Sequence, residues 1–161
     1  MKILTIAIRS YNSMDYMRNC IESLLPGGED VEILIVDDGS KDDTPAIADE
    51  YQEKYPGIVR AIHQENGGHG EAVNAGLRNA TGFFYKVVDS DDWVDAESYQ
   101  KILAFLKEAM KEEEPLDMLL SNYVYEKVGA KHKKVIQYHS ILPENRYFGW
   151  DEIGHFHASQ N

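Results

Sequence analysis

Three aspartates lie within four residues of one another, directly after a stretch that is typical of a buried β-strand. Residues 83–88 are aromatic or β-branched apart from Lys86, and Asp89, Asp91 and Asp92 follow. Two carboxylates about 4 Å apart repel each other by roughly 4 kcal/mol at an effective dielectric constant of about 20. A divalent cation offsets such repulsion, because hard cations take carboxylate oxygens. The pattern predicts a metal site here, and capping of the next helix is the alternative, strongest for Asp92.

The composition indicates a folded and acidic chain. Its 161 residues include 43% hydrophobic and 27% charged residues, which is enough for one domain with a core. The net charge of −12 argues against nucleic-acid binding, which needs a basic face. A phosphate-bearing ligand would then need a cation to mediate its binding. A single cysteine, Cys20, excludes a disulfide framework and a cysteine-rich zinc site.

Strand and helix patterns alternate along the first part of the chain. We expect strands at 3–8, 31–36, 58–63 and 83–88, with helices at 13–25, 44–55, about 70–80 and 95–111. Such alternation with short connections predicts an α/β fold, a mostly parallel Rossmann-like sheet with helices on both faces. Weaker patterns predict two further strands at 117–126 and 132–141.

Some local details of these elements can be checked in a structure. Ser13 is the expected N-cap of the first helix, and Pro45 follows Thr44 at the expected start of the second. The third helix should bury the face that carries Ala72, Val73, Gly76, Leu77 and Ala80, and the small residues on that face indicate close packing on the sheet. Lys86 conflicts with a buried strand, so it must face an acid across the sheet or lie on a partly open face.

Polar residues gather where the predicted strands end. Arg9 and Tyr11 follow the first strand, Asp37 and Asp38 end the second, and Asn66-Gly67-Gly68 follows the third. Because the carboxyl ends of parallel strands share one edge and ligands bind beyond it, we expect one site there. A plain Asp-Gly turn is the alternative for Asp38, and it is the favoured interpretation for Asp37.

These motifs, taken in order, resemble the inverting nucleotide-sugar glycosyltransferases of family 2, which have the GT-A fold. The matching segments are Ser-Tyr-Asn, Val-Asp-Asp-Gly-Ser, Asn-Gly-Gly with Asn74 and Gly76 downstream, and Asp-Ser-Asp-Asp-Trp. They cover residues 1 to about 110, and each lies at or near a predicted strand end.

The resemblance implies a role for each matching residue. Arg9 and Tyr11 would line the nucleotide, Asp38 would hydrogen-bond the uracil ring, and Asn66, Gly67 and Gly68 would close over the base and ribose. Asp89 and Asp91 would form the Asp-X-Asp motif. This motif holds the ribose and the Mn²⁺ or Mg²⁺ that bridges the diphosphate, and Asp92 is a possible further metal ligand.

The resemblance also implies a reaction. A sugar would pass with inversion from a UDP-sugar, of glucose or galactose type, to a hydroxyl of a glycan or glycolipid acceptor, with a carboxylate as general base. Arg9 departs from the proline or threonine that is frequent in the family; it could reach a phosphate or pack outward.

The end of the sequence is a second departure from the family. The family's base lies in a later Glu-Asp type motif, and no such motif appears before Asn161. We therefore expect a truncated single GT-A-like domain, with a nucleotide-binding core at 1–95 and the start of an acceptor-side portion at 96–161. A non-catalytic fragment that only binds nucleotide sugar is the alternative.

Other classes of protein fit the sequence less well. A signalling receiver domain would need its acidic pair after the first strand, and a nucleotidyltransferase would need a glycine-rich basic loop there. His155 and His157 lie two positions apart in the tail, a spacing that could bind a metal. Two such histidines without a further ligand are more often incidental than a metal site. Without a signal peptide or about 18 consecutive apolar residues, we expect a cytoplasmic chain. A position of the full-length protein at the inner membrane face and a homo-oligomer both remain open.

Overall fold

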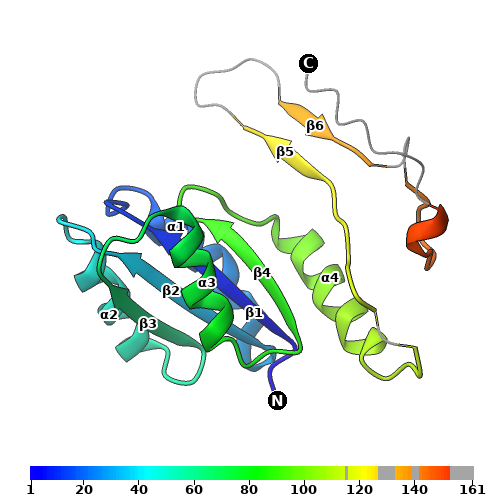
Figure 1. Cartoon of the computed structure of the whole chain (residues 1–161), viewed down its shortest axis with the longest axis horizontal. Coiled ribbons are helices and arrows are strands. Elements are labelled where there is room, and N and C mark those ends of the chain that lie inside the picture. The colour runs from blue at the N-terminus through cyan, green and yellow to red at the C-terminus, as the bar shows by residue number, and fades with distance from the viewer. Residues whose placement is uncertain (115, 127–132, 139–141, 153–161) are drawn as a thin grey trace. The chain divides into compact units, whose positions relative to one another are not determined.

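The computed structural model describes residues 1–114, 116–126, 133–138 and 142–152 (Figure 1). It divides the chain into two compact units, Met1–Pro115 and Leu116–Asn161. In the first unit the elements are β1 (Leu4–Ser10), α1 (Met17–Leu24), η1 (Leu25–Asp30), β2 (Val31–Asp38), α2 (Thr44–Lys54), β3 (Val59–Gln64), α3 (His69–Asn79), β4 (Phe84–Asp89) and α4 (Ala96–Ala109). The expected alternation of strands and helices is confirmed.

The four strands of this unit form one parallel sheet in the order β3-β2-β1-β4. The connections β1-α1-β2 and β2-α2-β3 move along the sheet in one direction, and β3-α3-β4 returns in the other. Because such crossovers are right-handed, α3 covers one face of the sheet while α1 and α2 cover the opposite face. Figure 1 shows α3 crossing the face formed by β1 and β2. The predicted α/β fold with helices on both faces is therefore confirmed.

Small residues allow α3 to lie close to the sheet. Ala72 and Ala75 pack against Ala7, Leu34 and Val36 of the two central strands. A Cβ at Gly76 would lie 2.7 Å from the Cβ of Ala7, so only glycine permits this approach. The expected face was partly wrong, because Leu77 points outward with 56% of its surface exposed and Ala75 is buried in its place.

The first helix begins later than the sequence indicated. Ser13 does not cap it; α1 starts at Met17, and the Ser13 hydroxyl is used by the loop instead. The predicted buried face, Met17, Cys20, Ile21 and Leu24, is confirmed. On α4 the predicted cap is confirmed, since the Asp95 carboxylate accepts from the Ser98 N–H at 2.9 Å.

Strand β4 is less enclosed than β1 and β2. In the described residues it pairs with β1 alone, and Lys86 is exposed. The conflict raised by Lys86 is thus resolved by an open face at an outer strand.

The second unit is described only in part. It contains β5 (Tyr123–Tyr125) and β6 (Lys134–Ile136), which pair antiparallel, and η2 (Trp150–Glu152). Both strands are shorter than expected, and His155 and His157 lie outside the described residues. Among the helices that the structure describes, none has the length and apolar character needed to cross a bilayer.

Candidate donor-binding site

The parallel sheet brings the predicted polar residues to one edge. In register, Asp38 of β2 lies beside Gln64 of β3, and Arg9 of β1 lies beside Asp89 of β4. The edge therefore has two acidic corners. We call them the β2 corner, which is Asp37 and Asp38, and the β4 corner, which is Asp89, Asp91 and Asp92.

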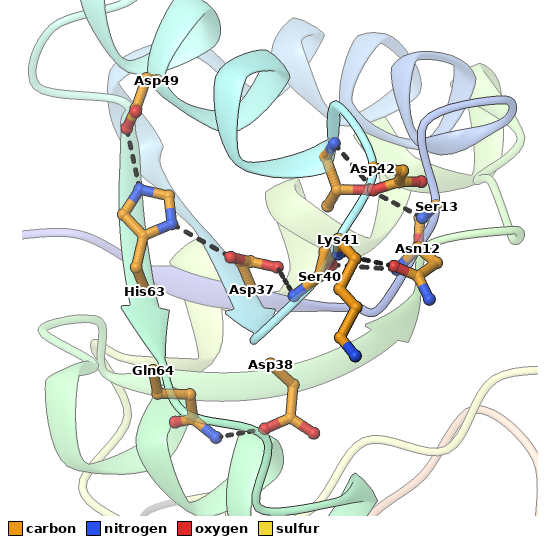
Figure 2. Close-up of polar contacts among 11 residues, drawn as sticks. Asn12, Ser13, Asp37, Asp38, Ser40, Lys41, Asp42, Asp49, His63 and Gln64 are labelled. Atoms are coloured by element: carbon orange, nitrogen blue, oxygen red, sulfur yellow. Dashed lines mark hydrogen bonds and ion pairs between the residues drawn. The ribbon is translucent and has the colours of Figure 1, made fainter.

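In the β2 corner, Asp38 holds the glycine loop. Its Oδ1 accepts from Gln64 Nε2 at 2.7 Å and from the Gly67 N–H at 2.8 Å, and its Oδ2 accepts from the Gly68 N–H at 2.9 Å. Figure 2 shows Asp38 and Gln64 meeting in this way. Burial alone would raise the pKa of Asp38, but these hydrogen bonds and the charge of Arg9 outweigh it and lower that pKa. Asp38 is thus an ionised acceptor whose Oδ2 has capacity for one more donor.

Asp37 anchors the turn after β2 from the opposite face of the sheet. Its Oδ1 accepts from the Ser40 N–H at 3.0 Å, and its Oδ2 lies 3.3 Å from His63 Nδ1. His63 Nε2 in turn lies 2.9 Å from Asp49 Oδ1 on α2, as Figure 2 shows. The hydrogen bond to Asp49 raises the pKa of His63, partial burial opposes the rise, and Asp37 adds to it. The sequence analysis missed this bridge, although His63 and Asp37 end adjacent predicted strands.

The loop after β1 is tied to the loop after β2. The Asn12 N–H donates to Ser40 Oγ at 2.9 Å, and Asn12 Oδ1 accepts from the Lys41 N–H at 2.9 Å (Figure 2). Asn12 has φ +48°, a left-handed conformation that asparagine tolerates better than most residues. Ser13 adds a bond from its N–H to Thr44 Oγ1 at 2.7 Å. The Ser-Tyr-Asn segment is therefore held in place by the protein itself.

The β4 corner has fewer partners. Arg9 Nε donates to Asp89 Oδ1 at 3.1 Å, and the Asp92 N–H closes a turn onto the Asp89 carbonyl at 3.0 Å. Among the described residues, the carboxylates of Asp91 and Asp92 accept no hydrogen bond, and both residues are exposed. Burial, and then the charges of Asp91 and Asp89, raise the pKa of Asp92, while Lys86 partly offsets them. This corner therefore concentrates negative charge that the chain itself compensates only in part.

Buried hydroxyl and thiol groups of Ser13, Ser90 and Cys20 make contacts that hold the turn of the β4 corner. The hydroxyls of Ser13 and Ser90 lie 2.8 Å apart, and Ser13 Oγ also accepts from the Tyr11 N–H. Cys20 Sγ lies 3.6 Å from the Asp89 carbonyl oxygen. Burial first, and then the three aspartates, raise the pKa of Cys20 to about 12, so the thiol stays neutral. These contacts fix the backbone of Asp89 and Ser90 relative to α1 and the first loop.

A small hollow opens between the segment that follows β1 and the turn that follows β4. It has a volume of about 170 Å³ and is lined by Arg9, Tyr11, Ser13, Tyr16, Ser90 and Asp91. Pockets that enclose a drug-sized ligand measure about 300–1,000 Å³, so this hollow would take only part of such a molecule. Tyr11 and Asp91 are exposed at its rim.

The described residues do not supply a complete metal cage. No group of three or more histidine, cysteine, aspartate or glutamate side chains is placed there to hold one ion. Magnesium is nevertheless commonly held by one or two carboxylates together with substrate phosphates and waters. The oxygen donors of Asp89 and Asp91 fit such a partial site, in which the ligand completes the coordination.

Comparison with known proteins relates this chain to one family. The family model described as Glycosyl transferase family 2 matches residues 5–155. Over 124 residues the chain is 36% identical to the putative glycosyltransferase EpsH of Bacillus subtilis (strain 168). The aligned region covers 76% of this chain and 34% of EpsH. The chain thus spans about a third of the length of this curated relative.

Solved structures agree with this match. TarS 1–349 of S. aureus, in complex with UDP-GlcNAc, is similar with a TM-score of 0.59 and 33% identity over 68% of this chain and 32% of that one. The mannosyltransferase PcManGT from Pyrobaculum calidifontis is 24% identical, with a TM-score of 0.54 over 60% of this chain and 30% of that one. The second similarity shows a shared fold.

Proposed function

Because the chain belongs to glycosyltransferase family 2, we propose that it forms the donor-binding region of an enzyme that transfers a sugar from UDP with inversion. One observation carries the proposal: Asp38 with its glycine loop and the Arg9–Asp89 pair lie at one edge of one sheet. TarS, which is 33% identical over 68% of this chain, binds UDP-GlcNAc, and this supports a uridine nucleotide as the ligand.

We assign the base and ribose to the β2 corner. Asp38 Oδ2 keeps one free acceptor position, which suits the ring N–H of uracil. Asn66, Gly67 and Gly68 form the loop beside it, and Asp38 fixes the last two through their backbone N–H groups. Such preorganisation lowers the entropy lost on binding. Tyr11 lines the hollow and is exposed, so its ring is available to contact the nucleotide.

We assign the diphosphate and the metal to the β4 corner. Asp89 and Asp91 would hold Mn²⁺ or Mg²⁺, with Asp92 as a further ligand. The metal, when bound, would neutralise negative charge that develops on the departing diphosphate. The chain's own contribution is to hold these carboxylates on a turn that Ser90 and Cys20 fix from below.

The sugar and the acceptor follow from the family by analogy only. We propose a UDP-hexose donor of glucose or galactose type, with UDP-GlcNAc as the variant that the TarS complex favours. The acceptor would be a hydroxyl on a glycan or glycolipid. The catalytic base is not assigned; Glu152, in the second unit, is occupied by bonds from Arg146 at 2.7 Å and the Gly149 N–H at 3.2 Å.

The test is a calorimetric titration of UDP with and without Mn²⁺, on wild type and on Asp91→Ala. We expect metal-dependent binding that is weakened at least about tenfold in the variant, since a metal ligand is lost. Asp95→Asn is the matched control, because it removes one charge four residues away and keeps the helix cap. It should bind as wild type does.

Two outcomes would reject this assignment. Wild type that binds no UDP at any Mn²⁺ concentration would contradict the donor site itself. Equal weakening by Asp91→Ala and Asp95→Asn would mean that general charge, not metal ligation, affects the affinity. If binding is present, release of free sugar or transfer from UDP-sugars separates an active enzyme from a fragment that only binds the donor.

A further inference from the structure

Arg9 lies between the two acidic corners. It is the penultimate residue of β1, with Val36 of β2 beside it on one side and Asp89 of β4 on the other. Its Nε donates to Asp89 Oδ1 at 3.1 Å, and its charge also lowers the pKa of Asp38. One guanidinium therefore acts on both the residue assigned to the base and the residue assigned to the metal.

Most of the donor capacity of Arg9 is unused. A guanidinium has five N–H donors, and within the described residues only the Nε donor of Arg9 has a partner. Its side chain is 31% exposed and that of Asp89 is 41% exposed, so their ion pair contributes little to stability. The geometry leaves the two terminal nitrogens for a ligand or for water.

The hollow beside Arg9 indicates what such a ligand must carry. Arg9 and Asp91 both line it, together with Ser13 and Ser90, while the base is assigned to the Asp38 side of Arg9. The part of a nucleotide that lies beyond the base and ribose is its phosphates. Arginine binds phosphate through two parallel N–H bonds, which are stronger than neutral hydrogen bonds.

We propose that Arg9 binds the diphosphate of the donor directly, as a fixed cation beside the metal position. This inference rests on the proposed donor site and adds a second source of positive charge to it. The site then has part of its affinity for UDP without any divalent metal. During transfer the same guanidinium stabilises the negative charge of the departing UDP.

The experiment compares UDP with uridine, which carries no phosphate, in calorimetric titrations with Mn²⁺ and with EDTA. Wild type should bind UDP in EDTA more weakly than with Mn²⁺ but at least about tenfold more tightly than uridine. Arg9→Gln should reduce the affinity for UDP in EDTA by roughly 10- to 100-fold and leave uridine binding within about twofold. Arg9→Lys keeps the charge but loses the planar guanidinium, so its affinity for UDP in EDTA should lie between those of wild type and Arg9→Gln.

Arg18→Gln is the matched control, because Arg18 also pairs with a carboxylate, that of Glu50, on the outer surface of α1 and α2, where the two side chains are 45% and 51% exposed. Its binding should equal that of wild type. Thermal melting of each variant tests whether it is folded. If Arg9→Gln is unfolded, the UDP and uridine affinities of Arg9→Lys are compared with those of wild type instead.

Three results would overturn the inference. Equal loss of uridine and UDP affinity in Arg9→Gln would mean that Arg9 shapes the base pocket. UDP affinity that is unchanged in Arg9→Gln would mean that the guanidinium faces only solvent and Asp89. Failure of wild type to bind UDP even with Mn²⁺ would reject the donor site, and this inference with it. The first two results leave the donor site intact, so the two failures are distinguishable.

Discussion

The two acidic corners of the sheet edge both consist of aspartates that follow a strand, but their carboxylates differ in how many hydrogen-bond partners they have. In the β2 corner the two carboxylates accept or share bonds with Ser40, His63, Gln64, Gly67 and Gly68. In the β4 corner, within the described residues, Asp89 pairs with Arg9 and the carboxylates of Asp91 and Asp92 pair with nothing. The comparison teaches that acids at strand ends can build a site in two ways. One pair fixes loops, and the other cluster leaves two exposed carboxylates without a partner among the described residues.

The largest contrast should appear in stability. Asp38→Ala removes three hydrogen bonds to a carboxylate, so we expect a loss of about 2–4 kcal/mol in the free energy of unfolding. Asp91→Ala removes an exposed carboxylate in a like-charged cluster, so it should change stability by less than about 0.5 kcal/mol. Urea denaturation of both variants measures the difference. Equal losses would show that both corners are structural.

A second contrast tests how closely the β2 turn approaches the glycine loop. Gly39 has φ +72°, and a Cβ there would lie 2.7 Å from the Asn66 backbone nitrogen. Gly57 has φ +82° with open space around it. Both alanine variants place a residue with a side chain in the left-handed conformation, so this cost is common to them. Because only Gly39→Ala also brings a Cβ against the Asn66 backbone, it should be less stable than Gly57→Ala by a further ~1–2 kcal/mol. Similar urea denaturation midpoints for the two variants would mean that the loop containing Asn66 moves away from the new Cβ at little cost.

The smallest contrast concerns pH. The bonds to Asp49 and Asp37 raise the pKa of His63 in the folded protein. Charged His63 therefore contributes stability fully below its unfolded pKa of about 6.5, and the contribution is lost as pH rises through the folded value. Because the side chain is 42% exposed, we expect only a few tenths of a kcal/mol after solvent screening.

The measurement is urea denaturation of His63→Gln at about pH 6 and about pH 9. The variant should be less stable than wild type at the lower pH, and the gap should narrow at the higher pH. His69→Gln is the control, because it changes an exposed histidine that has no hydrogen-bond or ion-pair partner among the described residues. A gap that widens with pH would mean that neutral His63 makes the stronger bridge.

The strands and their shared edge could be predicted because their signals are local. The strands are mostly apolar runs, and each is followed by a polar motif whose place follows from parallel pairing. Boundaries of β3 and β4 moved by one residue, so that Asp89 is the last residue of its strand. The resemblance to family 2 was confirmed by the family match and by the GT-A neighbours.

What the sequence did not reveal depends on contacts between distant residues. Ser13 looks like a helix cap, but Tyr11 and Ser90 are its partners, and Ser90 lies 77 positions away. The choice of Ala75 over Leu77 as a buried residue depends on how α3 rotates against Ala7 and Leu34. The roles assigned to the site residues stay predictions until ligand binding is measured.

The strand order also determines when the two corners can form as the chain is synthesised. β1, β2 and β3 pair in the order in which they leave the ribosome, and the Asp38 bonds need no residue beyond Gly68. β1 gains its second neighbour only when β4 arrives, and Arg9 and Asp89 are separated by 80 positions. Closing so long a loop costs more entropy than the earlier pairings, and N-terminal segments fold first during synthesis. The β4 corner is therefore the later of the two corners to assemble, and the diphosphate binding that we propose for it would report that β4 has joined the sheet.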